Sequence, residues 1–290
     1  MKNIDLHMHS TASDGTFTPS ELIDLAEKLN LAAIALTDHD TISGLPEFME
    51  KSKTADVVAV PGVEIAINWN YKELHILGLW VRDDCKELND LLEEIRKNRH
   101  IRNDKIIAKL QENDYNITID EVREVASGES IGRPHLAAIL VRKGYFKTVQ
   151  DVFSTCLARG GTAYMPRTLP DPESAISTIH KAGGLTFWAH PVHRNHSRTK
   201  DLFSNLKYFK SLGLDGVEAY YSEFSQAQHQ KLLKYAQELN MIVCGGSDFH
   251  GENQPGVQMG KGRGSLSVPE TVYNDLQEHI KKENYNCTQT

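Results

Sequence analysis

Histidine and aspartate residues occur in close pairs at three points of the sequence. His7 and His9 are two positions apart in DLHMHS, Asp248 and His250 have the same spacing in GSDFH, and His39 stands between two aspartates in TDHD. Side chains two positions apart on a strand point to the same face, so each pair could present two ligand atoms in one direction. Neutral imidazoles and carboxylates are ligands of divalent transition metals, and these pairs could therefore bind metal.

Four more ionisable residues lie in or beside apolar strand-like runs. Glu64 lies within AVPGVEIAI, His75 within ELHILGLW, His190 ends LTFWAH, and Asp14 follows the first run. Each residue alone has an ordinary structural explanation. TDHD could be a solvated turn, a strand histidine could be hydrogen-bonded in the core, and Glu64 could pair with an arginine. These alternatives stay open for each residue separately.

The nine residues taken together favour metal binding. They are His7, His9, Asp14, His39, Glu64, His75, His190, Asp248 and His250. Burying so many ionisable groups at one end of several strands is costly unless they are paired or bind cations. A catalytic zinc site takes about three protein ligands, so this set suits two or three divalent ions. Imidazole and carboxylate without thiolate favour Mn, Fe or Zn.

The elements that position these residues alternate between strands and helices. Short apolar runs at 3–9, 32–37, 57–67, 75–81, 185–190, 215–219 and 241–244 predict strands of a mainly parallel sheet. Thr18 and Glu21 around Pro19 form a capping-box helix start. Further helices are expected at 172–182, 199–212 and 225–239. The pattern predicts an α/β fold.

The alternation is interrupted between residues 84 and 167. The segment begins with a long charged helix and continues in shorter helical pieces, with a break at GRPH. We expect a mostly helical insertion at 84–167, which would serve as a substrate cap, within a barrel domain formed by 1–83 and 168–290.

Six motifs, in this order, resemble those of the PHP family of metal-dependent phosphoesterases, named for polymerase and histidinol phosphatase: DLHMHS, TDHD, PGVEI, HILG, AHP and GSDFH. The resemblance covers essentially the whole chain. It implies a distorted (β/α)7 barrel with a polynuclear metal site at the C-terminal ends of the strands, where barrel enzymes keep their chemistry.

The resemblance also implies how the ligands are shared among the ions. They would be His7, His9, Glu64 and Asp248 for the first ion, Glu64, His75 and His190 for the second, and Asp14, His39 and His250 for the third. For Asp38 and Asp40 we expect a role in orienting an imidazole ring. Asp248, His190 and His250 are the expected catalytic residues, and either histidine could pass a proton to the leaving group.

The GRPH motif bears on the choice of substrate. Arg133 and His135 could contact a phosphate, because arginine binds phosphate in a bidentate manner; an ordinary turn and helix start explains them equally well. The stand-alone branch that the chain resembles acts on nucleotide 3′,5′-bisphosphates and the 5′ ends of short RNA, in the manner of a 5′-3′ exoribonuclease. That resemblance favours Arg133 and His135 as phosphate contacts, with His193 and Arg194 as weaker candidates.

Composition sets further limits. The chain has 290 residues, a formal net charge of −7 and 40% hydrophobic residues, so no overall basic field attracts nucleic acid. The four cysteines form no CxxC pair, which argues against a disulfide framework or a thiolate zinc site. The sequence shows no secretory signal and no membrane-spanning run, and nothing in it indicates an obligate protein partner. We therefore expect a cytoplasmic protein.

Three functions are consistent with these observations. The favoured one is a metal-dependent phosphoesterase that cleaves nucleotides or short oligonucleotides with metal-activated hydroxide. The second is a phosphatase of a small metabolite such as histidinol phosphate. The third is a non-catalytic metal-binding module, against which the complete ligand set argues. A base-stacking surface would favour the first, and Tyr145, Phe146 and Tyr164 are candidates for it, although they could equally be core residues.

Overall fold

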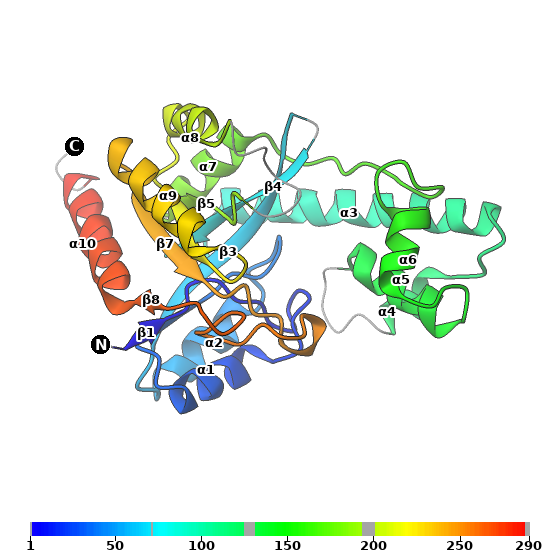
Figure 1. Ribbon diagram of the computed structural model, residues 1–290, viewed down its shortest axis with the longest axis horizontal. Helices are drawn as coiled ribbons and strands as arrows, with labels where there is room; N and C mark the ends of the chain where they lie inside the picture. The colour runs from blue at the N-terminus through cyan, green and yellow to red at the C-terminus, as the bar shows by residue number, and fades with distance from the viewer. Residues whose placement is uncertain (1, 71, 125–130, 193–200, 288–290) are drawn as a thin grey trace.

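The computed structural model describes residues 2–70, 72–124, 131–192 and 201–287. Six strands form a curled sheet in the order β2-β3-β4-β5-β6-β7 (Figure 1). Their bounds are β2 Ala33–Leu36, β3 Val58–Trp69, β4 Lys72–Leu79, β5 Leu185–Trp188, β6 Gly216–Tyr221 and β7 Ile242–Gly246. Each of these strands falls within or overlaps a range expected from the sequence.

The segment after β1 (Asn3–Ile4) closes this sheet into a barrel. Asp5 forms a parallel bridge with Ile34 of β2, and Met8 forms one with Phe249 beyond β7. The N–H of Leu6 also donates to the carbonyl of Gly245 at 3.0 Å. Residues 5–9 thus take the place of the seventh strand between β7 and β2, which confirms the distorted seven-stranded α/β barrel. β1 itself pairs with β8 (Val268–Pro269).

Gly246, at the end of β7, allows this strand to approach residues 5–9 closely. A Cβ atom on Gly246 would collide with the backbone nitrogen and the Cβ atom of His7. Any larger residue at this position would therefore push apart the two chain segments that carry His7 and Asp248.

One strand runs against the direction that the sequence pattern indicated. β4 is antiparallel to both β3 and β5, whereas β2–β3, β5–β6 and β6–β7 are parallel. The two residues between β3 and β4 are too few for the crossover that parallel strands require. Consequently His75 lies in the first half of β4, where it is opposite Ala66 of β3. The reversed direction brings His75 to the barrel end where the parallel strands finish.

Helices surround the sheet and bury one set of its side chains. They are α1 Pro19–Lys28, α2 Leu45–Ser52, α7 Pro172–Lys181, α8 Leu202–Ser211, α9 Gln226–Glu238 and α10 Glu270–Cys287. The expected capping box of α1 is confirmed, since Thr18 and Glu21 bond each other's backbone N–H groups. Ile34 and Leu36 pack in the cluster under the helices, while Ala33 and Ala35 join an inward-facing cluster. The inward-facing cluster fills the interior of the barrel below the end at which the parallel strands finish.

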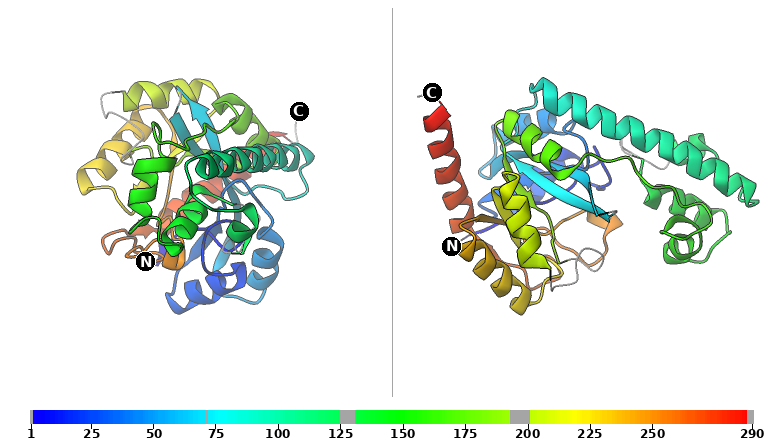
Figure 2. Two further views of the ribbon diagram at one scale, coloured as in Figure 1. Left: turned by 90° about the vertical axis from the view of Figure 1, so that its right-hand side faces the viewer. Right: turned by 90° about the horizontal axis from the view of Figure 1, so that it is seen from above.

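The segment between β4 and β5 is mostly helical. It contains α3 Lys86–Glu112, α4 Ile119–Arg123, α5 Arg133–Arg142, α6 Val149–Val152 and a π-helical turn at Phe153–Leu157. Leu88 and Leu92 of α3 belong to the barrel core, whereas Ile106 and Leu110 belong to a separate cluster with the shorter helices. α3 extends beyond the barrel, and the shorter helices gather at its far end (Figure 1 and Figure 2). The division of the chain into barrel domain and cap at 84–167 stays a prediction.

In the part of the chain that the structure describes, no helix is both long enough and apolar enough to cross a lipid bilayer.

Candidate metal centre

Glu64 lies at the centre of a ring of histidines at one end of the barrel. Its side chain is fully buried on β3. Oε1 lies 2.8 Å from Nδ1 of His75 and 3.0 Å from Nε2 of His190. Oε2 lies 2.8 Å from Nδ1 of His39, and the Nε2 atoms of His7 and His9 are at 3.4 and 3.3 Å. Five imidazoles from four segments of the chain therefore converge on one carboxylate.

Asp248 faces the same ring from the end of β7. Its Oδ1 lies 3.3 Å from Nε2 of His7 and 3.1 Å from Nε2 of His9. Asp248 has a φ angle of 58°, and His190 has one of 32°. Such left-handed backbone conformations are costly for residues other than glycine and concentrate at functional sites.

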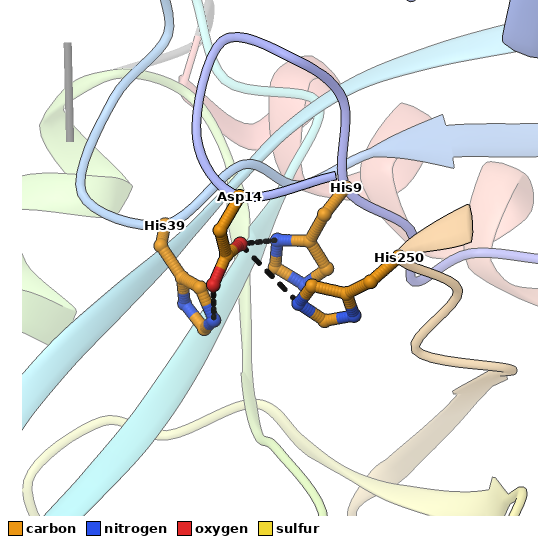
Figure 3. Close-up of side chains that lie close together, drawn as sticks. All are labelled: His9, Asp14, His39 and His250. Carbon is orange, nitrogen blue, oxygen red and sulfur yellow. Dashed lines mark ion pairs between the residues drawn. The ribbon is translucent and has the colours of Figure 1, made fainter. Parts of the chain in front are cut away.

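Asp14 forms a second group with the histidines on the outer side of the ring. Its Oδ1 lies 3.3 Å from Nε2 of His250 and 3.9 Å from Nδ1 of His9, and its Oδ2 lies 4.0 Å from Nε2 of His39. Figure 3 shows these four side chains pointing toward one another. The His9 ring stacks on that of His250 with centroids 4.0 Å apart.

The nine side chains singled out in the sequence thus come together. Three groups have ligand atoms within 4.8 Å of one another: His9, Asp14, His39 and His250; His7, His9, Glu64 and Asp248; and His39, Glu64 and His75. The second group equals the set expected for the first ion. In the first group His9 joins the three residues expected for the third ion. In the last group His39 takes the place of His190, which belongs to none of the three groups although its Nε2 lies 3.0 Å from Glu64. Their assignment to particular ions stays a prediction.

The cluster of histidines and carboxylates fits cations, because several of its buried nitrogen and oxygen atoms have no hydrogen-bond partner among the described residues. Nε2 of His7, both ring nitrogens of His9, Oε2 of Glu64 and Oδ1 of Asp248 are buried and make no hydrogen bond within the described residues. The Nε2 atoms of His7 and His9 nevertheless lie only 3.1–3.4 Å from Oε2 of Glu64 and Oδ1 of Asp248. Buried polar atoms without partners are costly, and cations at this position would satisfy all of them. The cluster is therefore able to bind metal.

The charges in the cluster are strongly coupled. Burial would raise the pKa of Glu64, but His39, His75 and His7 outweigh burial and hold it well below its usual range. Burial would lower the pKa of His75, but Glu64 and Glu73 raise it to about 10. Asp14 and Asp248 likewise outweigh burial at His250 and raise its pKa to about 10. In the metal-free protein the carboxylates are ionised and these imidazoles carry protons.

Comparison with known proteins agrees with this geometry. A model of the PHP domain matches residues 5–166. The chain belongs to the PHP domain family. It is 34% identical to a 5′-3′ exoribonuclease of Haemophilus influenzae over 86% of this chain and 90% of that protein. It is 31% identical to a 3′,5′-nucleoside bisphosphate phosphatase of Chromobacterium violaceum over 97% of this chain and 98% of that protein.

A solved structure shows the same architecture. A Bifidobacterium adolescentis protein assigned as a metal-dependent phosphoesterase superimposes with a TM-score of 0.82 and 29% identity. The superposition covers 94% of this chain and 95% of that protein. The PHP chain described here is accordingly a phosphoric ester hydrolase with a cluster able to bind metal.

One carboxylate of this PHP chain that was not predicted from the sequence holds two of the histidines. Glu218 of β6 is fully buried. Its Oε1 lies 2.8 Å from Nδ1 of His7, and its Oε2 accepts the backbone N–H of His190 at 2.6 Å. A bond at Nδ1 leaves Nε2 of His7 free to face the cluster. The signal was present in the sequence, since Glu218 interrupts an apolar strand just as Glu64 does.

The expectation that Asp38 and Asp40 orient imidazoles is corrected by their partners. Asp38 accepts hydrogen bonds from the backbone and hydroxyl of Ser10, both at 2.7 Å. Asp40 pairs with Arg99 and with Arg167, the latter at 2.7 Å. Both arginines bond Oδ2 of Asp40, and its Oδ1 accepts the N–H of Ala66. The carboxylate that bonds an imidazole in the expected way is Glu218.

Arginines line a cavity beside the histidines, and three of the four were not foreseen. This cavity of about 100 Å³, called here the arginine cavity, is lined by Asp14, His39, Glu73, His75, Arg99, Arg102, Gly132, Arg133, Pro134 and Arg167. Arg99 and Arg102 lie three positions apart on α3 and so share a helix face, a signal that the sequence offered. Arg167 lies in the loop that precedes α7 and carried no such signal.

The four guanidinium groups exceed the carboxylates that pair with them. Asp40 bonds Arg99 and Arg167, and Glu73 bonds Arg167 at 2.6 Å. Four guanidinium groups thus share two carboxylate partners, and Arg102 and Arg133 form no ion pair within the described residues. Arg102 is buried, and its Nε makes no hydrogen bond within the described residues. Burial, with the neighbouring arginines, lowers the pKa of Arg102 to about 9.

The four residues expected to contact substrate differ in their position relative to the arginine cavity. Arg133 lines the arginine cavity, and its Nη1 also donates to the carbonyl of Leu157 at 3.3 Å. His135 is not among the described residues that line this cavity. Its Nδ1 accepts the N–H of Gly132 at 3.0 Å at the start of α5. His193 and Arg194 lie outside the described residues. Phosphate contact by any of these residues stays a prediction.

Loading of the metal-free protein with zinc should release protons. At pH 7.5 His75 and His250, both with a pKa of about 10, must lose their protons before they can bind metal. His7 must do the same, because Glu218, Asp248 and Glu64 outweigh burial and hold its pKa well above the ordinary value. We expect release of about three protons per chain, measured by calorimetry in buffers of different ionisation enthalpy. Metal affinity should rise as the pH increases from 6.5 toward 10.

The sign of the pH effect on the fold is opposite to that on metal affinity. In the metal-free protein the raised pKa values of His75 and His250 stabilise the fold below pH 6.5, and this contribution is lost as the pH rises to about 10. A His250→Gln variant should release fewer protons on loading. Release that does not depend on His75 or His250 would contradict their place in the cluster.

Proposed function

We propose that this chain is a metal-dependent phosphoesterase that acts on nucleoside 3′,5′-bisphosphates and on short oligonucleotides with a 5′-phosphate. The observation that carries the proposal is the arginine cavity next to the histidine cluster. Arg102 and Arg133, which form no ion pair within the described residues, could together bind a phosphate monoester, which carries a charge of about −1.5 to −2 near neutral pH. One phosphate would lie at the cluster while a second is held by the arginines.

The residues of the cluster would hold two or three divalent ions of Mn, Fe or Zn. Bound ions of this kind lower the pKa of water and neutralise the developing charge on phosphoester oxygens. Glu64, placed between the histidine groups, would contact more than one ion. Glu218 keeps the His7 ring in position, and Tyr221 donates from its hydroxyl to Oδ2 of Asp248 at 2.9 Å.

The arginines would set substrate choice rather than perform the cleavage. Arg99 and Arg167 are already held by Asp40, so they form a rigid wall. Arg102 and Arg133 have no carboxylate within 4.0 Å among the described residues, and they are the ones we expect to bind the second phosphate. His190 and His250 remain the proposed donors of a proton to the leaving oxygen, a role open only to a ring nitrogen that does not bind metal.

The similarity to named relatives supports the same substrate class. The exoribonuclease and the bisphosphate phosphatase both act on phosphate esters of nucleotides, as their names state. A metabolite with a single phosphate, such as histidinol phosphate, would leave the arginine cavity unused. For this reason the metabolite phosphatase is the weaker candidate.

Removal of Arg102 or Arg133 should distinguish these substrates. Replacing either with alanine should cost about 1.5–3 kcal/mol, the range for hydrogen bonds to charged groups. This is a loss of roughly 10- to 150-fold in kcat/KM for a nucleoside 3′,5′-bisphosphate. Hydrolysis of p-nitrophenyl phosphate should stay within about twofold of wild type, because it has no second phosphate.

The test combines phosphate release with metal analysis of each protein. Arg123→Ala is the matched control, because Arg123 lies in the same helical segment but is exposed and pairs with Asp120 at 2.9 Å. Equal losses on both substrates would refute the specificity role. A wild-type protein that contains metal but releases no phosphate from nucleotides or oligonucleotides would refute the proposed function.

A further inference from the structure

A second pocket adjoins the arginine cavity on the side of the β3–β4 hairpin. This cavity of about 290 Å³, called here the side pocket, is lined by Asn68, Lys72, Glu73, Arg159, Tyr164, Pro166, Arg167 and Leu169. Its volume is close to the lower end of the usual range for small-molecule sites, roughly 300 Å³. None of the residues expected to bind metal lines it.

The two cavities share a wall. Glu73 and Arg167 line both of them and are joined by an ion pair of 2.6 Å. Arg167 also bonds Asp40 at 2.7 Å, and its side chain is 8% exposed. A ligand whose phosphate occupies the arginine cavity could therefore extend past Arg167 into the side pocket.

The side pocket is held open by bonds at both of its ends. One wall is the hairpin, and the other is the segment that returns from the helical insertion to α7. The N–H of Asn68 donates to the carbonyl of Pro170 at 2.9 Å, and Glu73 bonds Arg167 at the opposite end. Both walls are thus fixed relative to the arginine cavity before a ligand binds, which lowers the entropic cost of binding.

The lining fits a nucleobase with its sugar. Tyr164 supplies a half-buried aromatic ring, and Pro166 and Leu169 add apolar surface. Asn68 contributes an amide that can donate and accept hydrogen bonds. Bases stack on aromatic side chains in proteins that bind single strands.

The charges of the side pocket fit the same ligand. Its only described carboxylate, Glu73, is paired with Arg167, and Arg167 with His75 and Arg133 outweighs burial and holds the Glu73 pKa well below its usual range. Lys72 and Arg159 are exposed at the rim. They could contact the phosphate of a following nucleotide.

The other aromatic residues suggested by the sequence are used elsewhere. Tyr145 and Phe146 both contact Tyr115 within the helical insertion, with ring centroids 5.4 Å apart in each pair. Tyr164 is the member of that set which faces a cavity beside the histidine cluster.

We propose that the side pocket binds the nucleobase of the substrate, with Tyr164 as the stacking residue. This proposal rests on the proposed function, since it takes the arginine cavity as the site of the substrate's 5′-phosphate. It explains how the chain would prefer nucleotides over other bisphosphates. A stacked base requires only a flat aromatic face, so the pocket accepts different bases.

The test compares binding of adenosine 5′-monophosphate and ribose 5-phosphate by calorimetry, at matched metal content. The two ligands share the phosphate and the sugar and differ in the base. Wild-type protein should bind the nucleotide about 5- to 150-fold more tightly, the range that corresponds to one stacked base. Tyr164→Ala should reduce this ratio to within about twofold, whereas Tyr164→Phe should keep it.

Tyr145→Ala is the control, because Tyr145 is 38% exposed in the helical insertion and lines neither cavity among the described residues. It should leave the ratio at the wild-type value. A ratio unaffected by Tyr164→Ala, or equal weakening of both ligands, would overturn the side-pocket proposal.

Failure of this proposal can be told apart from failure of the proposed function. Phosphate release from bisphosphates without any Tyr164-dependent preference would keep the function and remove the base site. Nucleotide binding that depends on Tyr164, in a protein that releases no phosphate from any nucleotide, would support the base site and refute the function.

Discussion

Replacing Glu64 with glutamine should abolish metal loading and phosphoester hydrolysis together. Glu64 is fully buried, and five imidazole nitrogens lie within 3.4 Å of its two oxygens. Glutamine preserves the shape but lacks the negative charge and offers a single acceptor oxygen. Clustered ions supply several kcal/mol of transition-state stabilisation, so turnover should fall on the order of 10³-fold or more.

The loss should be equal for p-nitrophenyl phosphate and for a nucleoside bisphosphate, because both need the ions. Metal content by mass spectrometry and kcat for the two substrates give the measurement. Glu87→Gln is the control, since Glu87 is a glutamate at the exposed start of α3. Circular dichroism checks that the variant folds. A folded Glu64→Gln protein with wild-type metal content and turnover would show that the carboxylate is not part of a metal site.

Replacing Asp40 with alanine should give the largest loss of stability among single substitutions at this end of the barrel. Asp40 is fully buried and accepts the N–H of Ala66 at 2.9 Å together with bonds from Arg99 and Arg167. Its removal leaves two guanidinium groups, 10% and 8% exposed, without their common partner. Breaking a buried ion pair in this way costs about 3–5 kcal/mol.

Urea unfolding of the metal-free protein measures the free energy. Asp120→Ala is the matched control, because Asp120 also pairs with an arginine, but its side chain is 82% exposed. Exposed pairs contribute roughly 0–1 kcal/mol. A loss at Asp40 no larger than that at Asp120 would mean that the arginines find other partners and that the wall of the arginine cavity does not depend on Asp40.

The pH dependence of the Asp40 contribution follows from its pKa. Burial would raise this pKa, but Arg167 and Arg99 outweigh burial and lower it to about 2 from the ordinary value of 3.8. A lowered carboxylate pKa contributes stability above pH 3.8 that is lost as the pH falls toward 2. The difference in unfolding free energy between wild type and Asp40→Ala should therefore be constant above about pH 5 and shrink below pH 3.8.

The candidate ligands were predictable because strands carry a local signal. Side chains alternate with a period of two along a strand, so His7 and His9 had to share a face. Glu64 and His75 stood out as ionisable residues in apolar runs. Parallel strands end at one side of a sheet, which indicated that these residues meet. Together with the order of six motifs, this local information sufficed for the family, the barrel and the nine converging side chains.

Strand direction and pairing partners required the tertiary structure. The reversed β4 brings His75 to the cluster from the first half of its strand, because the β3–β4 connection is too short for a crossover. Glu218 carried the same local signal as Glu64, yet its position behind His7, 211 residues away in the sequence, depends on closure of the barrel.

The sequence by itself thus determined which residue types lie at the ends of which strands, because that information is local. Only the tertiary structure decided the surroundings of Asp40, whose two arginines lie 59 and 127 positions away in the sequence. It also decided that Arg102 and Arg133 share a cavity and that Tyr164 faces the side pocket. Such contacts join segments that the sequence pattern describes separately, and their geometry is set by how the helical insertion packs on the barrel.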